Sequence, residues 1–147
     1  MSTRTASRSV SRTTVVPASP VTVFALLADP ARHPDVDGSG TVRARLRGPS
    51  RLSLGARFGM RMRLGVPYVM TSRVVEFEED RRIAWQHVGR HVWRWELAPV
   101  PEGTRVTETF DWGPSLAPRV LEQLGVPARN ARSIELSLAR LRDLVSG

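Results

Sequence analysis

The residues from Thr41 to Trp112 alternate between apolar and polar side chains in one segment after another, and this alternation constrains the fold more than any other feature. A period of two is the pattern of a half-buried β-strand, in which successive side chains point to opposite faces. In TVRARLRG, Val42, Ala44 and Leu46 alternate with arginines, and ARFGMRMRL repeats the arrangement. The whole stretch therefore predicts a run of about six antiparallel strands separated by turns.

The later strands are expected to place most of their aromatic residues on one inner face. The residues that share this face in RIAWQHV, HVWRWEL and TRVTETFDW are Ile83, Trp85, His87, His91, Trp93, Trp95, Leu97, Val106, Glu108, Phe110 and Trp112. In the earlier ARFGMRMRL, one face carries Phe58, Met60, Met62 and Leu64. Pro67 is expected to interrupt the chain before a strand over residues 68–77, whose two faces we leave unassigned.

Helical signals flank the strand region on both sides. A strand over residues 9–16 is followed by Ser19, a suitable N-cap, and by Pro20, which suits a first helical position. Near the C-terminus, apolar residues recur at steps of three and four from Ala131 onward, at Ile134, Leu138, Leu141 and Val145. This stripe predicts a final helix that must bury one side, and the inner face of the sheet is the surface available to cover it.

The length of 147 residues suits one domain, which we place at residues 9–147 after a polar, disordered tail over residues 1–8. No cysteine is present, which excludes disulfides and thiolate metal sites and mildly favours a cytoplasmic location. His33, His87 and His91 are the three residues that could supply imidazole ligands, and no thiolate accompanies them, so we expect neither a metal site nor a cofactor. The longest uncharged stretch has 16 residues and contains two prolines, which argues against membrane insertion.

All 22 basic residues are arginine, and the formal net charge is +8. Clustered arginines attract phosphates, so a nucleic-acid surface is one interpretation of this charge. Most of these arginines alternate along strands, however, and a solvated arginine-rich surface is the other interpretation. We therefore expect no specific binding of nucleic acid.

Four stretches carry a resemblance to a known family, which extends over residues 9–145. They are SRTTVVPASPVTVFALLADPARHPDV, RVVEFEEDRRIAWQHV, WRWELAPVPEGTRVTETFDW and GVPARNARSIELSLARLRDLV. The chain resembles the START-like superfamily, in its polyketide cyclase/dehydrase and lipid-transport branch, the SRPBCC group. The resemblance implies an α+β helix-grip fold, in which an antiparallel sheet wraps around a long C-terminal helix and encloses a cavity. It implies no shared set of catalytic residues.

The residues expected to line this cavity and bind a ligand are Phe58, Met60, Met62, Tyr68, Met70, Trp85, His91, Trp93, Trp95, Phe110 and Leu138. Methionines and aromatic rings suit an apolar ligand, although the same residues also suit an ordinary filled core. Glu108 differs from them, because an ionised carboxylate facing an apolar interior is costly unless it is paired. Glu108 is therefore the candidate general acid or base, with His87 or His91 as its partner; a structural pairing with an arginine is the alternative.

Three classes of function follow from these residues and from the resemblance. The first is binding of an apolar small molecule that is polyketide-like, aromatic or lipid-like. The second is a cyclase or dehydratase that acts on such a ligand. The third is an interaction protein whose arginine-rich face binds RNA or another acidic partner. A homodimer is left open as the assembly.

Overall fold

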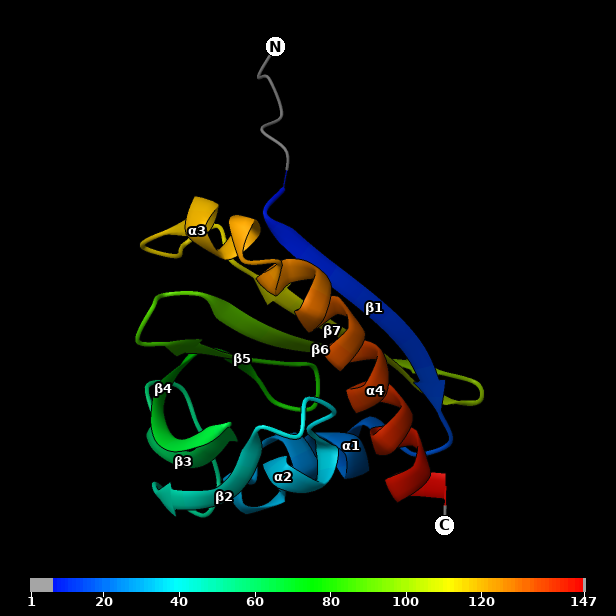
Figure 1. The fold of residues 1–147 in the computed structure, drawn as a ribbon. Helices are drawn as coiled ribbons and strands as arrows, with labels where there is room; N and C mark the ends of the chain where they lie inside the picture. Colours follow the sequence, from blue (N-terminus) through cyan, green and yellow to red (C-terminus); the bar gives the residue numbers. More distant parts are fainter. Residues whose placement is uncertain (1–6, 147) are drawn as a thin grey trace.

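The computed structural model describes residues 7–146, which form a single antiparallel sheet with helices at its inner face and ends (Figure 1). The strands are β1 (Ser9–Val16), β2 (Val42–Arg47), β3 (Arg57–Leu64), β4 (Val66–Glu78), β5 (Arg82–His87), β6 (Val92–Val100) and β7 (Gly103–Asp111). The helices are α1 (Pro20–Leu27), α2 (His33–Val36), α3 (Pro118–Gln123) and α4 (Val126–Ser146), with a 3₁₀ turn at Pro30–Arg32. The predicted α+β fold, a sheet wrapped around a long C-terminal helix, is confirmed.

The strands lie in the order β1-β7-β6-β5-β4-β3-β2. Strands β2 to β7 pair as consecutive antiparallel neighbours, as their alternating sequence predicts. β1 pairs with β7 instead, with Ser9 opposite Asp111 and Val16 opposite Thr104. This pairing places β1 beside α4, which runs along both β1 and β7 (Figure 1).

α1 begins where the sequence predicts. The side chain of Ser19 accepts a hydrogen bond from the backbone N–H of Thr22 at 3.3 Å, and Pro20 occupies the first turn. Asp29 caps the following 3₁₀ turn by accepting from the backbone N–H of Ala31 at 3.0 Å. The two caps reverse the chain direction between β1 and β2, so that α1 and α2 lie together at the lower end of the molecule in Figure 1.

The hydrophobic core lies between the sheet, α1 and the C-terminal part of α4. The side chains that the two helices bury there are Val23, Phe24, Leu27, Ile134, Leu138 and Leu141. Val145 is half-buried against the same cluster. The predicted apolar stripe of the final helix is therefore packed on the sheet, and burial of this kind is the main favourable term in folding.

Pro67 does not interrupt the chain, contrary to the sequence prediction. β4 runs through it and pairs it with Arg63 of β3. β5 pairs with β4 from Ser72 onward, so Pro67 lies in a part of β4 that has one neighbouring strand. A proline is tolerated there because no second strand needs its missing N–H.

The final helix starts earlier than its apolar stripe. Gly125 takes a left-handed φ of 73°, which ends the preceding helical segment, and α4 begins at Val126 with Pro127 in its first turn. Residues 1–6 of the predicted tail lie outside the described residues. The carbonyl of Arg8 accepts a hydrogen bond from the backbone N–H of Trp112 at 2.9 Å. Between residues 7 and 146, no helix is long and apolar enough to cross a membrane.

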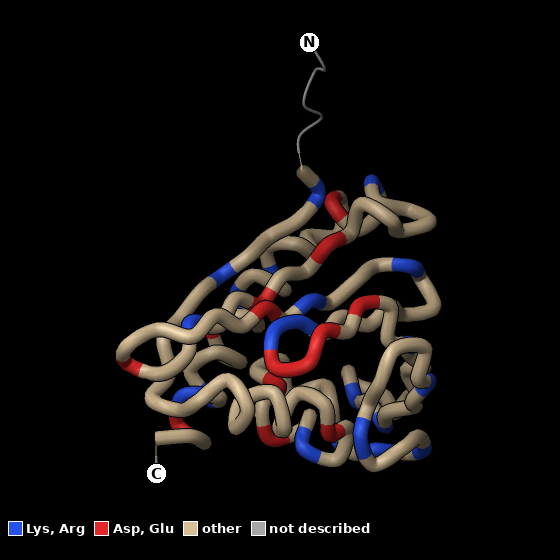
Figure 2. Tube along the Cα trace, turned by 180° about the vertical axis from the view of Figure 1, so that it is seen from behind, with Lys and Arg blue, Asp and Glu red and all other residues tan. Residues whose placement is uncertain are grey.

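Positive charge gathers at one end of the sheet. Residues 38–75 contain eight arginines and no Asp or Glu, whereas the other 14 arginines of the chain are matched by 14 acidic residues. This segment forms β2, β3 and most of β4. In Figure 2, which views the molecule from behind, that end of the sheet lies at the lower right and carries blue segments. Within the described part of the chain, Arg51 is the member of the eight that forms an ion pair, with Glu79.

Candidate functional site

A cavity of about 390 Å³ lies between the inner face of the sheet and the N-terminal half of α4. Strands β3 to β7 form its floor, and Leu27, His33, Val36 and the loop after α2 form one side. Because the sheet curves around α4, neither element fills this space completely. The volume lies in the range of small-molecule sites in proteins.

The structure places ten of the eleven predicted ligand-binding residues on the cavity wall. They are Phe58, Met60, Met62, Tyr68, Met70, Trp85, His91, Trp93, Trp95 and Phe110. The two candidate catalytic residues, Glu108 and His87, line the same cavity. Alternation along each strand brings these side chains to one face, and the antiparallel register brings the faces together.

Leu138 is the exception, and the structure corrects its assignment. Leu138 is 4% exposed and packs in the hydrophobic core instead of lining the cavity. α4 presents a different side to the cavity, formed by Val126, Arg129, Asn130, Ser133 and Ser137. Apolar periodicity shows that a helix face is buried, but it does not distinguish burial against a core from burial against a cavity.

Aromatic rings pack against one another along the cavity wall. His33 stacks on Trp85 with ring centroids 4.8 Å apart and an interplanar angle of 22°, and Phe58 meets both rings edge-on. Trp93 lies against Phe110 at 4.9 Å. Such contacts hold large rings in fixed positions, so the wall is shaped before any ligand arrives.

The two candidate partner histidines contact each other. His91 Nε2 lies 3.2 Å from His87 Nδ1, so one ring donates a hydrogen bond to the other. Burial, with the neighbouring His91 ring adding to it, lowers the pKa of His87 to about 3. Burial also lowers the pKa of His91. Both rings are therefore neutral near pH 7.

His33 is a third histidine of the wall and was not among the predicted site residues. Its Nε2–H donates to the carbonyl of Leu27 at 2.8 Å, and burial lowers its pKa. His33 lies in a short irregular segment, where no periodicity indicates which side chains turn inward. The stack on Trp85 is thus visible only in three dimensions.

Glu108 and Trp95 occupy paired positions on β7 and β6, and both line the cavity. Glu108 is 5% exposed and Trp95 is 3% exposed. Within the described residues, Glu108 Oε1 and Trp95 Nε1 have no hydrogen-bond partner. Burial raises the pKa of Glu108 well above its ordinary value, and the negative charge of Asp37 raises it further.

Asp37 belongs to a loop that closes one side of the cavity and is tied to α4. Its carboxylate accepts from the backbone N–H of Val42 at 3.2 Å and from Ser39. Its carbonyl accepts from Arg140 of α4 at 2.7 Å. The next residue, Gly38, donates its N–H to Ser137 Oγ at 2.8 Å. These bonds fix the distance between the loop and the helix, and with it the width of the cavity.

The polar residues that α4 turns toward the cavity were also absent from the predicted site, although their spacing is visible in the sequence. Asn130, Ser133 and Ser137 recur at steps of three and four beside the apolar stripe. Among residues 7–146, no three His, Asp or Glu side chains converge in an arrangement that could hold a metal ion.

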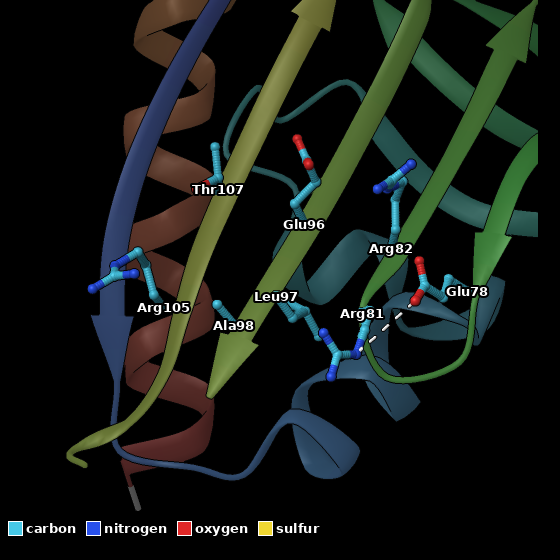
Figure 3. Close-up of a pocket in the computed structure, with 8 residues that line it drawn as sticks. All are labelled: Glu78, Arg81, Arg82, Glu96, Leu97, Ala98, Arg105 and Thr107. Atoms are coloured by element: carbon cyan, nitrogen blue, oxygen red, sulfur yellow. Dashed lines mark ion pairs between the residues drawn. The ribbon is translucent and has the colours of Figure 1, made fainter. Parts of the chain in front are cut away.

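A second depression, of about 510 Å³, lies on the opposite face of the sheet (Figure 3). Its lining includes Glu78, Arg81, Arg82 and Glu96, whose side chains project outward from the strands. Arg81 forms an ion pair with Glu78 at 4.0 Å, so the charges partly satisfy one another. We place the candidate site in the smaller cavity, because its polar atoms are buried and unpaired whereas those of the outer depression face solvent.

Comparison with known proteins finds curated relatives that match most of this chain. The uncharacterized protein Rv0088 of Mycobacterium tuberculosis strain H37Rv is 42% identical over an alignment of 140 residues, and the match covers 91% of this chain. This chain spans 62% of the length of that relative.

Solved structures share the fold at low identity. Protein NE0264 of Nitrosomonas europaea superimposes with a TM-score of 0.73 at 15% identity, covering 97% of each chain. The polyketide-cyclase-like protein Cgl2372 of Corynebacterium glutamicum superimposes with a TM-score of 0.62 at 20% identity, covering 94% of this chain and 91% of that one. The profile of the family described as polyketide cyclase / dehydrase and lipid transport matches residues 7–146. This chain therefore belongs to that family, within the START-like SRPBCC superfamily.

Proposed function

We propose that the protein binds an apolar small molecule, of polyketide-like, aromatic or lipid-like character, in the cavity between the sheet and α4. The observation that carries the proposal is the cavity itself, about 390 Å³ in volume and walled mainly by aromatic, methionine and aliphatic side chains. A few polar groups among many apolar ones are typical of sites that bind small ligands. The family described as polyketide cyclase / dehydrase and lipid transport supports the same class of ligand.

Tryptophan fluorescence tests this proposal, because Trp85, Trp93 and Trp95 all line the cavity. Titration with polycyclic aromatics, fatty acids and isoprenoids should shift or quench the emission at saturable concentrations. Ser133→Phe, which places a ring on the cavity side of α4, should weaken binding strongly. Ala139→Phe is the matched control, because Ala139 is exposed on the same helix and should leave binding unchanged.

The binding proposal fails if no compound of the panel alters the emission of the wild-type protein. It also fails if Ser133→Phe and Ala139→Phe bind the same compound equally well, because the ligand would then lie elsewhere. A cytoplasmic location and a homodimeric assembly stay predictions.

A cyclase or dehydratase that acts on such a ligand is the second candidate function, and the buried carboxyl group of Glu108, whose pKa burial raises, favours it. A buried acid with a raised pKa can donate a proton near neutral pH. His87 is less suited to be its basic partner, because a group with a pKa of about 3 binds protons weakly. Glu108→Gln separates the candidates: an enzyme should retain ligand binding and lose turnover, whereas a carrier should bind as before.

A further inference from the structure

We propose that the ligand carries an uncharged oxygen, a ketone or a hydroxyl, at its buried end, where Trp95 Nε1 and the carboxyl group of Glu108 hold it. This inference rests on the proposed function and specifies the chemistry of the ligand. It predicts that the site selects against carboxylic acids such as fatty acids and against amines.

The position of the pair at the end of the cavity follows from the register of β6 and β7. Trp95 lies opposite Glu108, and the next inward-facing pair on one side is Trp93 with Phe110, which also line the cavity. The next pair on the other side is Leu97 with Val106, which lies in the core outside the cavity. The Trp95–Glu108 pair therefore marks the point along these strands where the cavity stops.

The pair contains two polar atoms that lack a hydrogen-bond partner among the described residues. Glu108 Oε1 and Trp95 Nε1 are buried and form no hydrogen bond within the described residues. The pairs on either side of them are apolar, so these two groups make one polar spot on an apolar surface. A wholly hydrocarbon ligand pressed against this spot would leave an indole N–H and a carboxyl oxygen without hydrogen bonds, which is unfavourable.

The charges around the spot exclude an anion. Asp37 is near enough to Glu108 to disfavour a second negative charge, and the three histidines of the wall are neutral near pH 7. Among the described residues that line the cavity, Arg129 is the basic one, and it is exposed. A ligand carboxylate at the buried end would have no counterion among the described residues that line the cavity there.

A ketone oxygen fits because it can accept from the indole N–H and from the protonated carboxyl group at once. A hydroxyl fits because it can accept from Trp95 and donate to Glu108. An ammonium group has three donors and no acceptor, so it would leave the indole N–H of Trp95 without a partner.

The test is a series of naphthalenes of similar size and shape, studied by isothermal titration calorimetry at neutral pH. 2-Acetylnaphthalene supplies the ketone, 2-ethylnaphthalene replaces it with hydrocarbon, 2-naphthoate carries the anion and 2-naphthylmethylammonium carries the cation. We expect the ketone to bind about fivefold more tightly than the ethyl compound, the gain of one net hydrogen bond, and the two charged compounds to bind more weakly than either.

Variants assign the preference to the two side chains. Glu108→Leu and Trp95→Phe should each reduce the advantage of the ketone over the ethyl compound. Glu108→Gln should retain it, because the amide N–H can replace the donor of the protonated carboxyl group. Circular dichroism establishes that each variant is folded, and the wild-type series decides the question if one of them is not.

Each other outcome overturns the inference. If the ketone and the ethyl compound bind equally well, the proposed function is retained, but the inference that a ligand oxygen forms hydrogen bonds with Trp95 and Glu108 is wrong. Tightest binding of the ammonium compound means that Glu108 acts as a buried carboxylate, and tightest binding of 2-naphthoate means that a cation reaches the site. If no naphthalene binds and the fluorescence panel also fails, the proposed function falls together with the inference.

Discussion

At the scale of single residues, Glu108 links protonation to folding. An exposed glutamate in the unfolded chain has a pKa of about 4.3. In the folded protein, burial raises the pKa of Glu108 well above that value. Between the two pKa values the folded state keeps a proton that the unfolded state has released, so the free energy of unfolding decreases as the pH rises through this interval.

Glu108→Gln should remove this decrease. The variant cannot ionise, so its stability relative to the wild type should grow as the pH rises above about 4.3, until the folded pKa of Glu108 is passed. Urea denaturation at a series of pH values from acid to alkaline measures the difference. A difference that does not change with pH would show that the carboxyl group of Glu108 titrates normally in the folded protein.

Glu76→Gln is the matched control, with the opposite sign. Glu76 accepts three hydrogen bonds from Arg94 at 2.7–3.1 Å, and these bonds with the guanidinium charge hold its pKa below the ordinary value. The stability that Glu76 contributes is present above its unfolded pKa and is lost as the pH falls. Glu76→Gln should therefore destabilise the protein at neutral pH and have little effect in acid.

At the scale of elements, the sequence predicts most of the fold and part of the site. Alternation predicts that Trp95 and Glu108 face inward, and the structure pairs them directly, because strand register follows the buried face. α4 packs one side in the core and turns another side toward the cavity. The sequence does not predict this division, because periodicity identifies a buried side but not what covers it. The position of His33 on the cavity wall is not predictable for a related reason. It depends on the stack with Trp85, which lies more than fifty positions further along the chain.

Leu138→Asp should abolish or severely weaken folding. Leu138 is 4% exposed among apolar side chains, and a carboxylate there would have no partner. Leu144→Asp is the control on the same helix, because Leu144 is 41% exposed and should tolerate the charge. Thermal melting followed by circular dichroism compares the two. Equal melting temperatures would mean that α4 is not packed on the sheet.

Gly38→Ala should loosen the contact between the loop after α2 and α4. A Cβ atom at Gly38 would lie within 3 Å of the backbone nitrogen of Ser137, and backbone cannot move aside as a flexible side chain can. Gly59→Ala is the control, because its Cβ would meet the side chain of Arg47, which can move. We expect a loss of about 1–3 kcal/mol of stability for Gly38→Ala and a smaller loss for the control, measured by urea denaturation. Equal losses would show that the loop yields easily.

At the scale of the whole molecule, the net charge resides in one quarter of the chain. Residues 38–75 contribute eight arginines without an acidic residue, and the rest of the chain is formally neutral. This segment forms β2, β3 and most of β4, so the positive charge of the protein lies mainly at one end of the sheet (Figure 2). Alternation along the strands predicts a dispersed arginine surface. The order of the arginines along the chain already contains the segregation, but only the pairing of β2, β3 and β4 shows that it becomes a single region.

This region should bind nucleic acids weakly, without sequence preference and with a steep dependence on salt, because counterion release supplies the affinity. Fluorescence anisotropy with single-stranded RNA and duplex DNA, from about 50 to 200 mM salt, measures the slope. Replacing Arg61 and Arg63 with Gln should reduce the slope, whereas replacing Arg132 and Arg142 of α4 should change it less. Submicromolar, sequence-selective binding at physiological salt would instead favour the interaction-protein class over the cavity.

The strand order also determines when each part of the sheet can form during synthesis. Strands β2 to β7 each pair with the strand made just before or after them, so these hairpins can assemble as the chain emerges. β1 pairs within the sheet with β7, so residue 9 must wait for residue 111. Closing so long a loop is entropically costly and is a slow class of folding event. The first strand of this sheet to be synthesised is thus the last to pair, and its Thr- and Val-rich backbone stays without its partner strand until β7 has been made.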